Sequence, residues 1–339
     1  MKKVTVAILN WNGKKFLEQF LQILLDKTNN EFADIVIIDN ASTDDSLDYL
    51  KSNFPEVKTI VLEKNYGFAE GYNRGLKGIE TEYYLLLNSD IEVSDSWLEP
   101  LLDLMDNDKS IAVCGPKILS YYEKDRFEYA GAGGGFIDKY AYPFCRGRIF
   151  ETCEKDLGQY DSNIECFWIS GAAFMIRAEV FNLLNGFDND FFAHQEEIDL
   201  CWRVQNSGYK IVIQTQSKIY HVGAGTLPKS SPFKTYLNFR NNLYIIEKNI
   251  PKYKRNKIKF IRFFLDQIAF VKILFQGNFK EAFSIPKAYI HFWKNAKKMG
   301  KQRKIIKPKA LKYFKAYYNR SIVVDYYLRK IKTFDKLKF

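Results

Sequence analysis

Short apolar runs alternate with longer segments of helical spacing along the N-terminal part of the chain. The apolar runs cover residues 4–9, 35–38, 59–62 and 83–87. Such runs are typical of buried parallel strands, and apolar residues recur between them at the three- and four-residue spacing of helices. Repeated strand–helix–strand units predict an α/β fold with a mostly parallel, doubly wound sheet flanked by helices. Ligands of such sheets bind at the carboxyl ends of the strands.

The C-terminal third has a different pattern, because strand signals are absent and helical spacing prevails. Residues 257–275 carry apolar clusters that are interrupted by charges such as Arg262 and Asp266. These charges argue against a membrane-spanning helix, which needs roughly 20 mostly apolar residues. A basic amphipathic helix at a membrane interface fits better. We therefore expect a sheet domain over residues 1–233 and a basic, amphipathic helical extension over residues 234–339.

Charge divides the chain at the same place. Residues 234–339 contain 28 Lys and Arg against 5 Asp and Glu, a net charge of +23, whereas the preceding residues contain 23 against 35, a net charge of −12. The basic tail predicts attraction to an anionic membrane surface. A nucleic-acid-binding protein would also explain the tail through phosphate contacts, but it leaves the acidic body and its motifs unexplained.

Cysteine usage and the N-terminus bear on the compartment. The five cysteines contain no CxxC pair, so reduced thiols are a better interpretation than structural zinc or a disulfide framework. The sequence MKKVTVAILNWNG runs straight into a strand-like stretch and lacks the apolar core and cleavage site of a signal peptide. We expect a cytoplasmic protein that is peripheral at the inner face of the cell membrane.

Polar residues follow the first two predicted strands. Asn10 follows the first strand, within the sequence NWNG, and Asp39 stands at the exit of the second. A carboxylate in the place of Asp39 can accept the imide N–H of a pyrimidine base. It can equally bond to the amides of the turn.

Asn88 and Asp90 follow the apolar run YYLLL. Two oxygen-bearing side chains two residues apart at a strand end can point at one hard cation, and Mg²⁺ or Mn²⁺ suits such ligands and commonly bridges to substrate phosphates. A turn cap would explain the pattern as well.

The segment NYGFAEGYNRGL, residues 65–76, interleaves glycines with polar residues. Gly67 permits a close approach of the backbone to a ligand, Asn65 and Asn73 offer amides, and Arg74 offers a partner for a diphosphate. The alternative is a glycine-rich helix packed tightly on the sheet.

The segment FFAHQEEIDLCWR holds a further cluster of acids. On a helix, Asp199 and Arg203 are spaced four apart, which predicts a structural salt bridge. Glu196 lies on nearly the same face, whereas Glu197 is turned away and is a candidate general base. His221 follows another predicted strand and has glycines on its far side, so a ligand role and a structural role are both open.

The order of these motifs resembles family 2 inverting glycosyltransferases with the GT-A fold, and bacterial rhamnosyltransferase-like members in particular. The resemblance covers about residues 4–226 and rests on VAILNWNG, IVIIDNASTD, NYGFAEGYNRG, YYLLLNSD, ISGAAFMIR and EEIDLCWR. It implies that the sheet domain binds a nucleotide sugar.

The resemblance also implies roles for single residues. Asp39 would read the base, Asn88–Asp90 would stand at the metal-binding DxD position, and His221 would match a histidine that joins the metal in some relatives. The pair Glu196–Glu197 would supply the base. Two departures are visible: the first acid of DxD is Asn88, so metal affinity would rest on Asp90 and His221, and the usual Glu-Asp pair is Glu-Glu.

The sequence therefore predicts a metal-dependent inverting glycosyltransferase of cell-surface polysaccharide synthesis. Its donor is a nucleotide-diphosphate sugar, with dTDP-rhamnose as the first guess by resemblance alone, and its acceptor is a glycan or a lipid-linked hydroxyl. A UDP-hexose or galactofuranose transferase of the same fold is the alternative. A sugar nucleotidyltransferase expects a glycine- and basic-rich loop where NWNGKK stands, and a non-catalytic nucleotide-sugar binder remains open because of Asn88.

Overall fold

The computed structural model describes residues 2–129, 131–223 and 231–339, and within them the main sheet has nine strands. The strand order is β11-β13-β6-β12-β4-β1-β2-β3, and β5 pairs with β13. The parallel part is formed by β1 (Val4–Asn10), β2 (Ala33–Asp39), β3 (Lys58–Val61) and β4 (Tyr83–Leu87). These are the four strands that the apolar runs predict, and each lies within two residues of the expected bounds.

Helices α1 (Lys14–Lys27), α2 (Ser46–Asn53) and α3 (Gly67–Gly75) connect the parallel strands. Helix α1 buries Leu17, Leu21 and Leu24 along one face, which is the stripe that its spacing predicts. Gly67 opens helix α3, and the chain leaves helical geometry before Gly78, where φ is +80°.

The remaining strands make the sheet mixed. Strands β5 (Ile91–Val93), β6 (Ile111–Ser120), β11 (Ile164–Glu165), β12 (Ala173–Arg177) and β13 (Lys210–His221) complete it, with β12 antiparallel to both β4 and β6. Helices α4 (Glu99–Asn107), α5 (Ala178–Leu183) and α6 (Glu196–Asn206) and the 3₁₀ helix η1 (Asn189–Phe191) lie between these strands in the chain. The predicted α/β class with flanking helices is confirmed, and the sheet is mixed, because four of its strand pairs are antiparallel.

A second, five-stranded sheet lies beside the main one. It has the order β10-β9-β8-β7-β14, with β7 (Gly135–Asp138), β8 (Pro143–Cys145), β9 (Arg148–Ile149), β10 (Thr152–Cys153) and β14 (Tyr317–Tyr318). The sequence predicts no strand after residue 233, and β14 shows this to be wrong. A strand of two residues produces no detectable periodicity, and its pairing with β7 is a tertiary contact.

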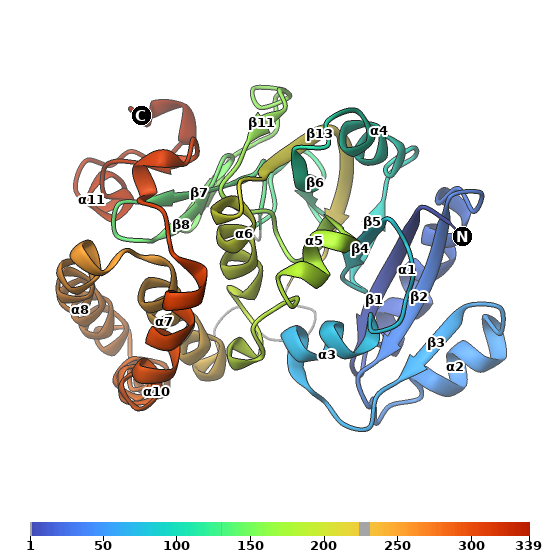
Figure 1. Cartoon of the computed structure of the whole chain (residues 1–339), viewed down its shortest axis with the longest axis horizontal. Helices are drawn as coiled ribbons and strands as arrows, with labels where there is room; N and C mark the ends of the chain where they lie inside the picture. Colours follow the sequence, from blue (N-terminus) through green and yellow to red (C-terminus); the bar gives the residue numbers. More distant parts are fainter. Residues whose placement is uncertain (1, 130, 224–230) are drawn as a thin grey trace.

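The C-terminal region is helical, as predicted. It contains α7 (Pro232–Asn249), α8 (Lys252–Phe275), α9 (Phe279–Ala282), α10 (Ser284–Ile306) and α11 (Ile322–Tyr327), with 3₁₀ helices η2 (Leu311–Tyr313) and η3 (Phe334–Lys336). Figure 1 shows these helices on the side of α6, away from α1, α2 and the first strands.

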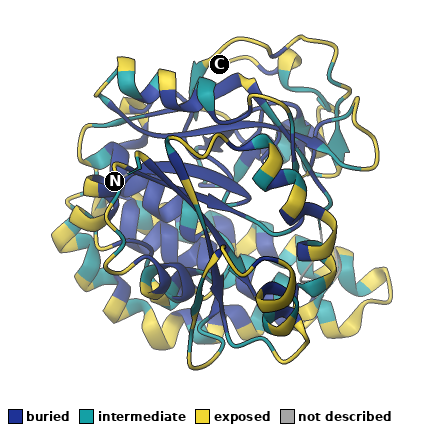
Figure 2. Cartoon of the chain, turned by 90° about the vertical axis from the view of Figure 1, so that its right-hand side faces the viewer, coloured by how far each residue is buried: buried dark blue, intermediate teal, exposed yellow. Residues whose placement is uncertain are grey.

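The helical region and the sheet region share one hydrophobic core. Leu243, Ile285 and Phe292 belong to the same buried cluster as Phe191 and Ile198. Figure 2 shows the strands buried between helices whose outer faces are exposed. The division at residue 233 thus marks a change in charge and in type of element, while the packing continues across it. No helix of the described residues is long and apolar enough to cross a membrane.

Candidate functional site

Asn10 and Asp39 end β1 and β2 and lie opposite each other in the parallel register. Asn10 Nδ2 donates to Asp39 Oδ2 at 3.1 Å, and the Ser42 backbone N–H donates to Asp39 Oδ1 at 2.9 Å. The Asn10 Oδ1 atom is enclosed and has no hydrogen-bond partner among the described residues. A side chain at Gly13 would collide with that oxygen, so the NWNG turn requires glycine at this position.

Asn65 and Gly67 lie beside these strand ends. Asn40, which follows Asp39, donates from Nδ2 to Asn65 Oδ1 at 3.0 Å and to the Gly67 carbonyl at 3.1 Å. Gly67 has φ +75°, and a β-carbon there would come within 2.6 Å of the Phe192 ring. The glycine is therefore required both by its backbone angle and by a close approach.

Asn73 and Arg74 are engaged in structural contacts. The Asn73 amide donates to the Phe187 carbonyl at 2.8 Å and accepts from the Phe187 N–H at 3.0 Å, which ties α3 to the loop before η1. Arg74 bonds Glu70 at 2.7 Å and stacks over the Tyr66 ring. A donor-binding role for these two residues stays a prediction.

The strand register brings Asp90 and His221 together. Ile91, the first residue of β5, pairs with His221 at the end of β13, so that Asp90 Oδ1 lies 3.2 Å from His221 Nε2. On the other side of the ring, His221 Nδ1 lies 3.3 Å from Glu128 Oε2. All three side chains are buried.

Charge sets the protonation of this cluster. Burial alone would favour a neutral imidazole, but Asp90 and Glu128 raise the pKa of His221 to about 10. Burial likewise opposes ionisation of Asp90, and the His221 charge outweighs it and lowers the pKa of Asp90.

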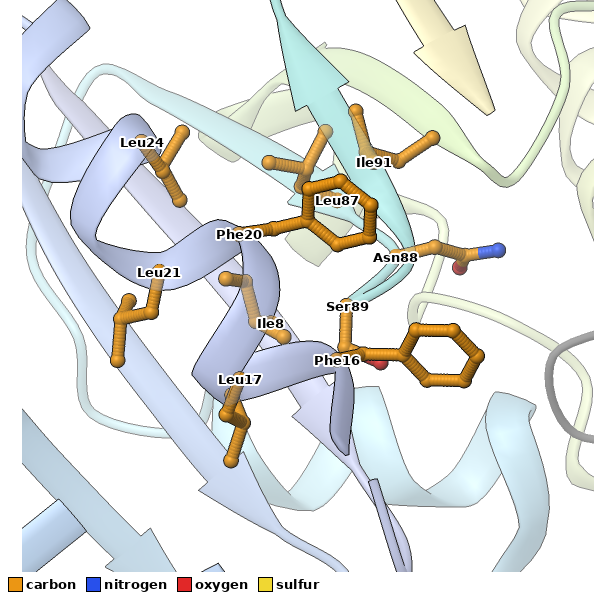
Figure 3. Close-up of a pocket in the computed structure, with 10 residues that line it drawn as sticks. All are labelled: Ile8, Phe16, Leu17, Phe20, Leu21, Leu24, Leu87, Asn88, Ser89 and Ile91. Atoms are coloured by element: carbon orange, nitrogen blue, oxygen red, sulfur yellow. The ribbon is translucent and has the colours of Figure 1, made fainter. Parts of the chain in front are cut away.

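Asn88 lies at the mouth of a small crevice between α1 and the β4–β5 turn (Figure 3). The crevice is lined mainly by apolar residues such as Phe16, Phe20 and Leu87, and its volume of about 10 Å³ is enough for little more than one water molecule. In Figure 3 the Asn88 amide points away from this apolar lining. The crevice is therefore packing space, and it is no substrate site.

Asp90 and His221 fit a divalent cation once His221 loses the proton that its raised pKa retains at neutrality. A carboxylate oxygen and an imidazole nitrogen face each other at a strand end, and substrate phosphates commonly supply the remaining ligands of such ions. The described residues contain no cluster of three His, Cys, Asp or Glu arranged to hold a metal alone.

Glu196 and Glu197 open helix α6 without a cationic partner. Neither carboxylate takes part in a salt bridge within the described ranges, and the Oε2 atom of each is enclosed without a hydrogen-bond partner. Burial, reinforced for Glu196 by the neighbouring carboxylate, raises the pKa of both groups, and the pKa of Glu197 rises to about 7. A carboxylate with this pKa can accept a proton near neutrality.

The turn that leads into α6 has an unusual backbone. Phe192, His194 and Gln195 have φ values of 65°, 68° and 68°, in the left-handed region that side chains other than glycine rarely adopt. Each such residue lowers the free energy gained on folding by about 1–3 kcal/mol, and the conformation persists only where surrounding contacts fix it. The Gln195 side chain is itself held, because Asn242 donates to its Oε1 at 3.1 Å.

Helix α7 holds this turn through Asn241. Its Nδ2 lies 3.1, 2.9 and 2.6 Å from the carbonyl oxygens of Phe191, Ala193 and His194, and Asn241 is fully buried. The first helix of the C-terminal region thereby fixes the backbone that delivers the two glutamates.

Asp199 lies in a buried network of opposite charge. Arg203 Nε and Lys248 Nζ each donate to Asp199 Oδ2 at 2.9 Å. Asn249 Nδ2 donates to Asp199 Oδ1 at 2.8 Å. Burial disfavours the charged form, but Lys248 and Arg203 outweigh it and lower the pKa of Asp199. The predicted Asp199–Arg203 salt bridge is present, and α7 adds two partners to it.

The glycine-rich segment packs against the turn that leads into the acidic pair. The backbone N–H groups of Phe68 and Ala69, in the first turn of α3, donate to the Phe192 carbonyl at 2.7 and 3.2 Å. A β-carbon added to Gly171 would lie 3.2 Å from the Phe68 ring and 3.9 Å from Glu197 Cβ. Thus α3, the loop before β12 and the start of α6 converge.

The family model for glycosyl transferase family 2 matches residues 5–184, just over half of the chain. The chain belongs to glycosyl transferase family 2. Its acidic pair and His221 lie beyond the matched residues, so their place in the site rests on the geometry above.

Curated relatives of this family 2 chain include two bacterial rhamnosyltransferases. The N-acetylglucosaminyl-diphospho-decaprenol L-rhamnosyltransferase of Mycobacterium tuberculosis is 22% identical over 64% of this chain and 75% of its own length. The dTDP-rhamnosyl transferase RfbF of Shigella flexneri is 23% identical over 68% of this chain and 76% of its own length. The resemblance stated from the motifs is confirmed.

Solved structures show the same fold. The structure of GalNAc-T7 with UDP, GalNAc and Mn²⁺ superposes with a TM-score of 0.63 at 17% identity, covering 93% of this chain and 56% of that one. Staphylococcus aureus TarS residues 1–349 with UDP gives 0.51 at 16% identity, covering 76% of this chain and 69% of that one. This chain thus spans little more than half of the GalNAc-T7 structure.

The structure also places residues that the motifs do not single out. Glu128 supports His221 from a loop, and Asn241, Lys248 and Asn249 reach the acidic helix from α7. A lone glutamate in a loop gives no sequence signal. The Asn241-Asn242 pair does give one, since two asparagines inside an apolar helix have low helix propensity and need a reason to be there.

Proposed function

We propose that this family 2 enzyme is a metal-dependent inverting transferase of cell-surface polysaccharide synthesis, with dTDP-rhamnose as donor and a glycan or lipid-linked hydroxyl as acceptor. The acceptor oxygen attacks the anomeric carbon from the face opposite the nucleoside diphosphate. The bond to the diphosphate breaks, and the acceptor proton passes to Glu197. A single displacement inverts the anomeric configuration.

The observation that carries this proposal is the Glu197 carboxylate, which has no salt-bridge partner among the described residues and lies at the start of α6. Its Oε2 atom has no hydrogen-bond partner among the described residues, and its pKa is raised to about 7 by burial. A half-buried carboxylate without a cationic partner has a cost for folding, which a catalytic role explains. Glu196, the first acid of the pair, is proposed as a further catalytic residue.

Asn10, Asp39, Asn65 and Gly67 are the proposed contacts of the donor nucleotide, since they gather at the ends of β1 and β2. Asn73, Arg74 and Asn88 remain proposed donor contacts that lie further along α3 and after β4. Asp90 and His221 would hold Mg²⁺ or Mn²⁺, which supplies positive charge to the leaving diphosphate when bound. His221 would have to give up its proton to become a ligand.

The donor is proposed from the names of the relatives. Two of them are rhamnosyltransferases, and one name specifies dTDP-rhamnose. A UDP-hexose or galactofuranose transferase is the second candidate, because the GalNAc-T7 and TarS structures hold UDP.

A thermal-shift screen of nucleotide sugars with and without Mn²⁺ tests the donor. The true donor should raise Tm by mass action, whereas the other sugars should not. Transfer to a lipid-linked acceptor, followed by NMR of the product, should then show an inverted anomeric carbon. Retention of configuration would contradict the single displacement, and the absence of any stabilising nucleotide sugar would contradict the function.

The metal is tested separately. Asp90→Ala should abolish transfer while the protein stays folded, and excess EDTA should have the same effect on the unaltered enzyme. Undiminished activity in EDTA would exclude the metal role. Asp95→Ala, a change of an exposed acid that pairs with Lys27, serves as the control.

The acceptor bears on location. If it is lipid-linked, the enzyme acts at a membrane, and we propose that the basic C-terminal region holds it at the anionic inner face of the cell membrane. Removing residues 234–339 cannot test this, because α7 and β14 belong to the core and to the second sheet. Surface substitutions are required.

A further inference from the structure

Helix α8 buries two charged residues, Arg262 and Asp266, and exposes a row of apolar residues. Arg262 and Asp266 are 2% and 1% exposed, and Ile258 is the other buried residue of this fully described helix. Its outer side carries five apolar residues that are between 45% and 87% exposed: Phe260, Phe264, Ile268, Val271 and Phe275. Their spacing of three and four places them on one face, which we call the α8 stripe.

A buried polar network explains how α8 is held without the stripe. Arg262 bonds Asp266 and Asn242 and lies over the Tyr142 ring at 3.7 Å. Asp266 accepts from the hydroxyls of Tyr142 and Tyr289 at 3.0 and 2.8 Å. Because these bonds fasten the inner face, the outward stripe contributes little to the core and is free to serve an interaction.

An apolar recess of about 200 Å³ opens beside the stripe, between α7, α8 and α10. Phe260 and Phe263 of α8 line one side, and Phe292 and Trp293 of α10 line the other. Trp293 is 61% exposed, although an aromatic ring of this size is usually covered in a soluble protein. The stripe and the recess form one apolar surface at the level of Phe260.

The surrounding charge is almost entirely positive. Residues 252–306 contain 15 Lys and Arg against 2 acids, of which Asp266 is buried and Glu281 bonds Thr235. A second copy of this chain would place two basic surfaces against each other. An anionic lipid surface complements both the charge and the apolar stripe, and interfacial helices with exposed Phe and flanking Lys have this character.

We propose that the α8 stripe and Trp293 insert into the headgroup region of an anionic bilayer, with a lipid acyl chain in the recess. The inference deepens the proposed function, on which it rests for the membrane acceptor. Helix α8 then lies along the surface, and its position beyond α7 leaves the glutamates of α6 outside the bilayer.

The first test is sedimentation of the full chain with vesicles of equal parts phosphatidylcholine and phosphatidylglycerol. The double variant Ile268→Gln/Phe275→Gln should bind these vesicles at least about tenfold more weakly than the unaltered protein, because it removes two exposed apolar side chains. The control, Leu157→Gln/Leu183→Gln, alters two residues that are 82% and 69% exposed elsewhere and should bind like the unaltered protein. Equal binding of the two double variants would overturn the proposal.

The readout does not require activity, so it separates this inference from the proposed function. Donor affinity should be unchanged in both double variants. Vesicles of phosphatidylcholine alone should bind the unaltered protein weakly, and failure to bind the anionic vesicles would overturn the proposal. A change from dimer to monomer in the Ile268→Gln/Phe275→Gln variant would also overturn the proposal, since it would show that a second copy of the chain covers the α8 stripe.

The second test identifies the face of the protein that contacts the bilayer. Vesicles that contain brominated acyl chains should quench tryptophan fluorescence, and Trp293→Phe should remove most of the quenching. Quenching that persists in Trp293→Phe would place another face of the protein on the membrane and overturn the proposal.

Discussion

The first turn of α6 places its carboxylates in opposite surroundings. Glu196 and Glu197 have no salt-bridge partner among the described residues, and their pKa values are raised. Asp199, only two residues later, bonds Lys248, Arg203 and Asn249, and its pKa is lowered. Burial is common to both regions, so the presence of cations decides which acid is ionised and inert and which can exchange a proton.

Replacement of Glu197 should have the largest effect. Glu197→Gln keeps the shape and removes the proton acceptor, so kcat should fall by about 10²–10⁴-fold, the usual contribution of general base catalysis. Donor affinity should hardly change. Glu179→Gln, an exposed glutamate in the first turn of α5, is the matched control. Near-normal turnover of Glu197→Gln would assign the base to another residue, with Glu196 the next to be tested.

Replacement of Asp199 should instead reduce stability. Asp199→Asn leaves Lys248 and Arg203 without their shared anion in a buried place, which typically costs about 3–5 kcal/mol of unfolding free energy. Urea denaturation measures this loss. Asp188→Asn, which removes only the other partner of Lys248, should cost less. A folded, fully stable but inactive Asp199→Asn would reverse the comparison and make Asp199 the base.

Replacement of Asn241 tests whether α7 positions the acidic pair. Asn241→Ala frees the carbonyls of the strained turn, so we expect kcat to fall by about 10–10²-fold through misplacement of Glu197, with smaller changes in KM. Asn295→Ala removes an exposed asparagine of α10 and should leave kcat unchanged. A stability loss with normal kcat would limit Asn241 to a role in folding.

The pH dependence of activity and of stability should differ between Glu197 and Asp199, with a smaller effect than the substitutions above. Because the pKa of Glu197 is about 7, kcat/KM should fall about tenfold per pH unit below that value. The folded state binds this proton more tightly than the unfolded state, so the stability from Glu197 is complete at low pH and is lost as pH rises through 7. Asp199 has a lowered pKa, so its contribution is lost only as pH falls into the acid range. Calorimetry of the unaltered protein beside Glu197→Gln from pH 5 to pH 8 should isolate the contribution of Glu197 from those of Glu196 and His221, whose pKa values are also raised. A flat activity profile would contradict the assignment of Glu197.

The parallel half of the sheet could be predicted from sequence because its signal is local. Strands β1–β4 are continuous apolar runs, and the polar residues that follow them are neighbours in space because parallel strands end at one edge. The start of α6 and its acidic pair were also visible as a motif.

The remaining features depend on contacts between distant residues. Glu128 reaches His221 across about 90 positions, and Lys248 reaches Asp199 across about 50, with no shared pattern in the chain. The orientation of α8 was predicted only in part: an amphipathic helix is present, but its buried face carries Arg262 and Asp266. These two residues pair with Asn242 and Tyr142, which are distant in the chain.

The pairing of β14 with β7 has a consequence for how the enzyme is made. Tyr317 pairs with Ile137, so the second sheet joins parts of the chain that are 180 residues apart. Contacts of this separation form late, because a long loop must close first. During synthesis the second sheet therefore cannot be completed until residue 318 has left the ribosome, and a chain that stops before residue 317 leaves the edge of β7 exposed to aggregation.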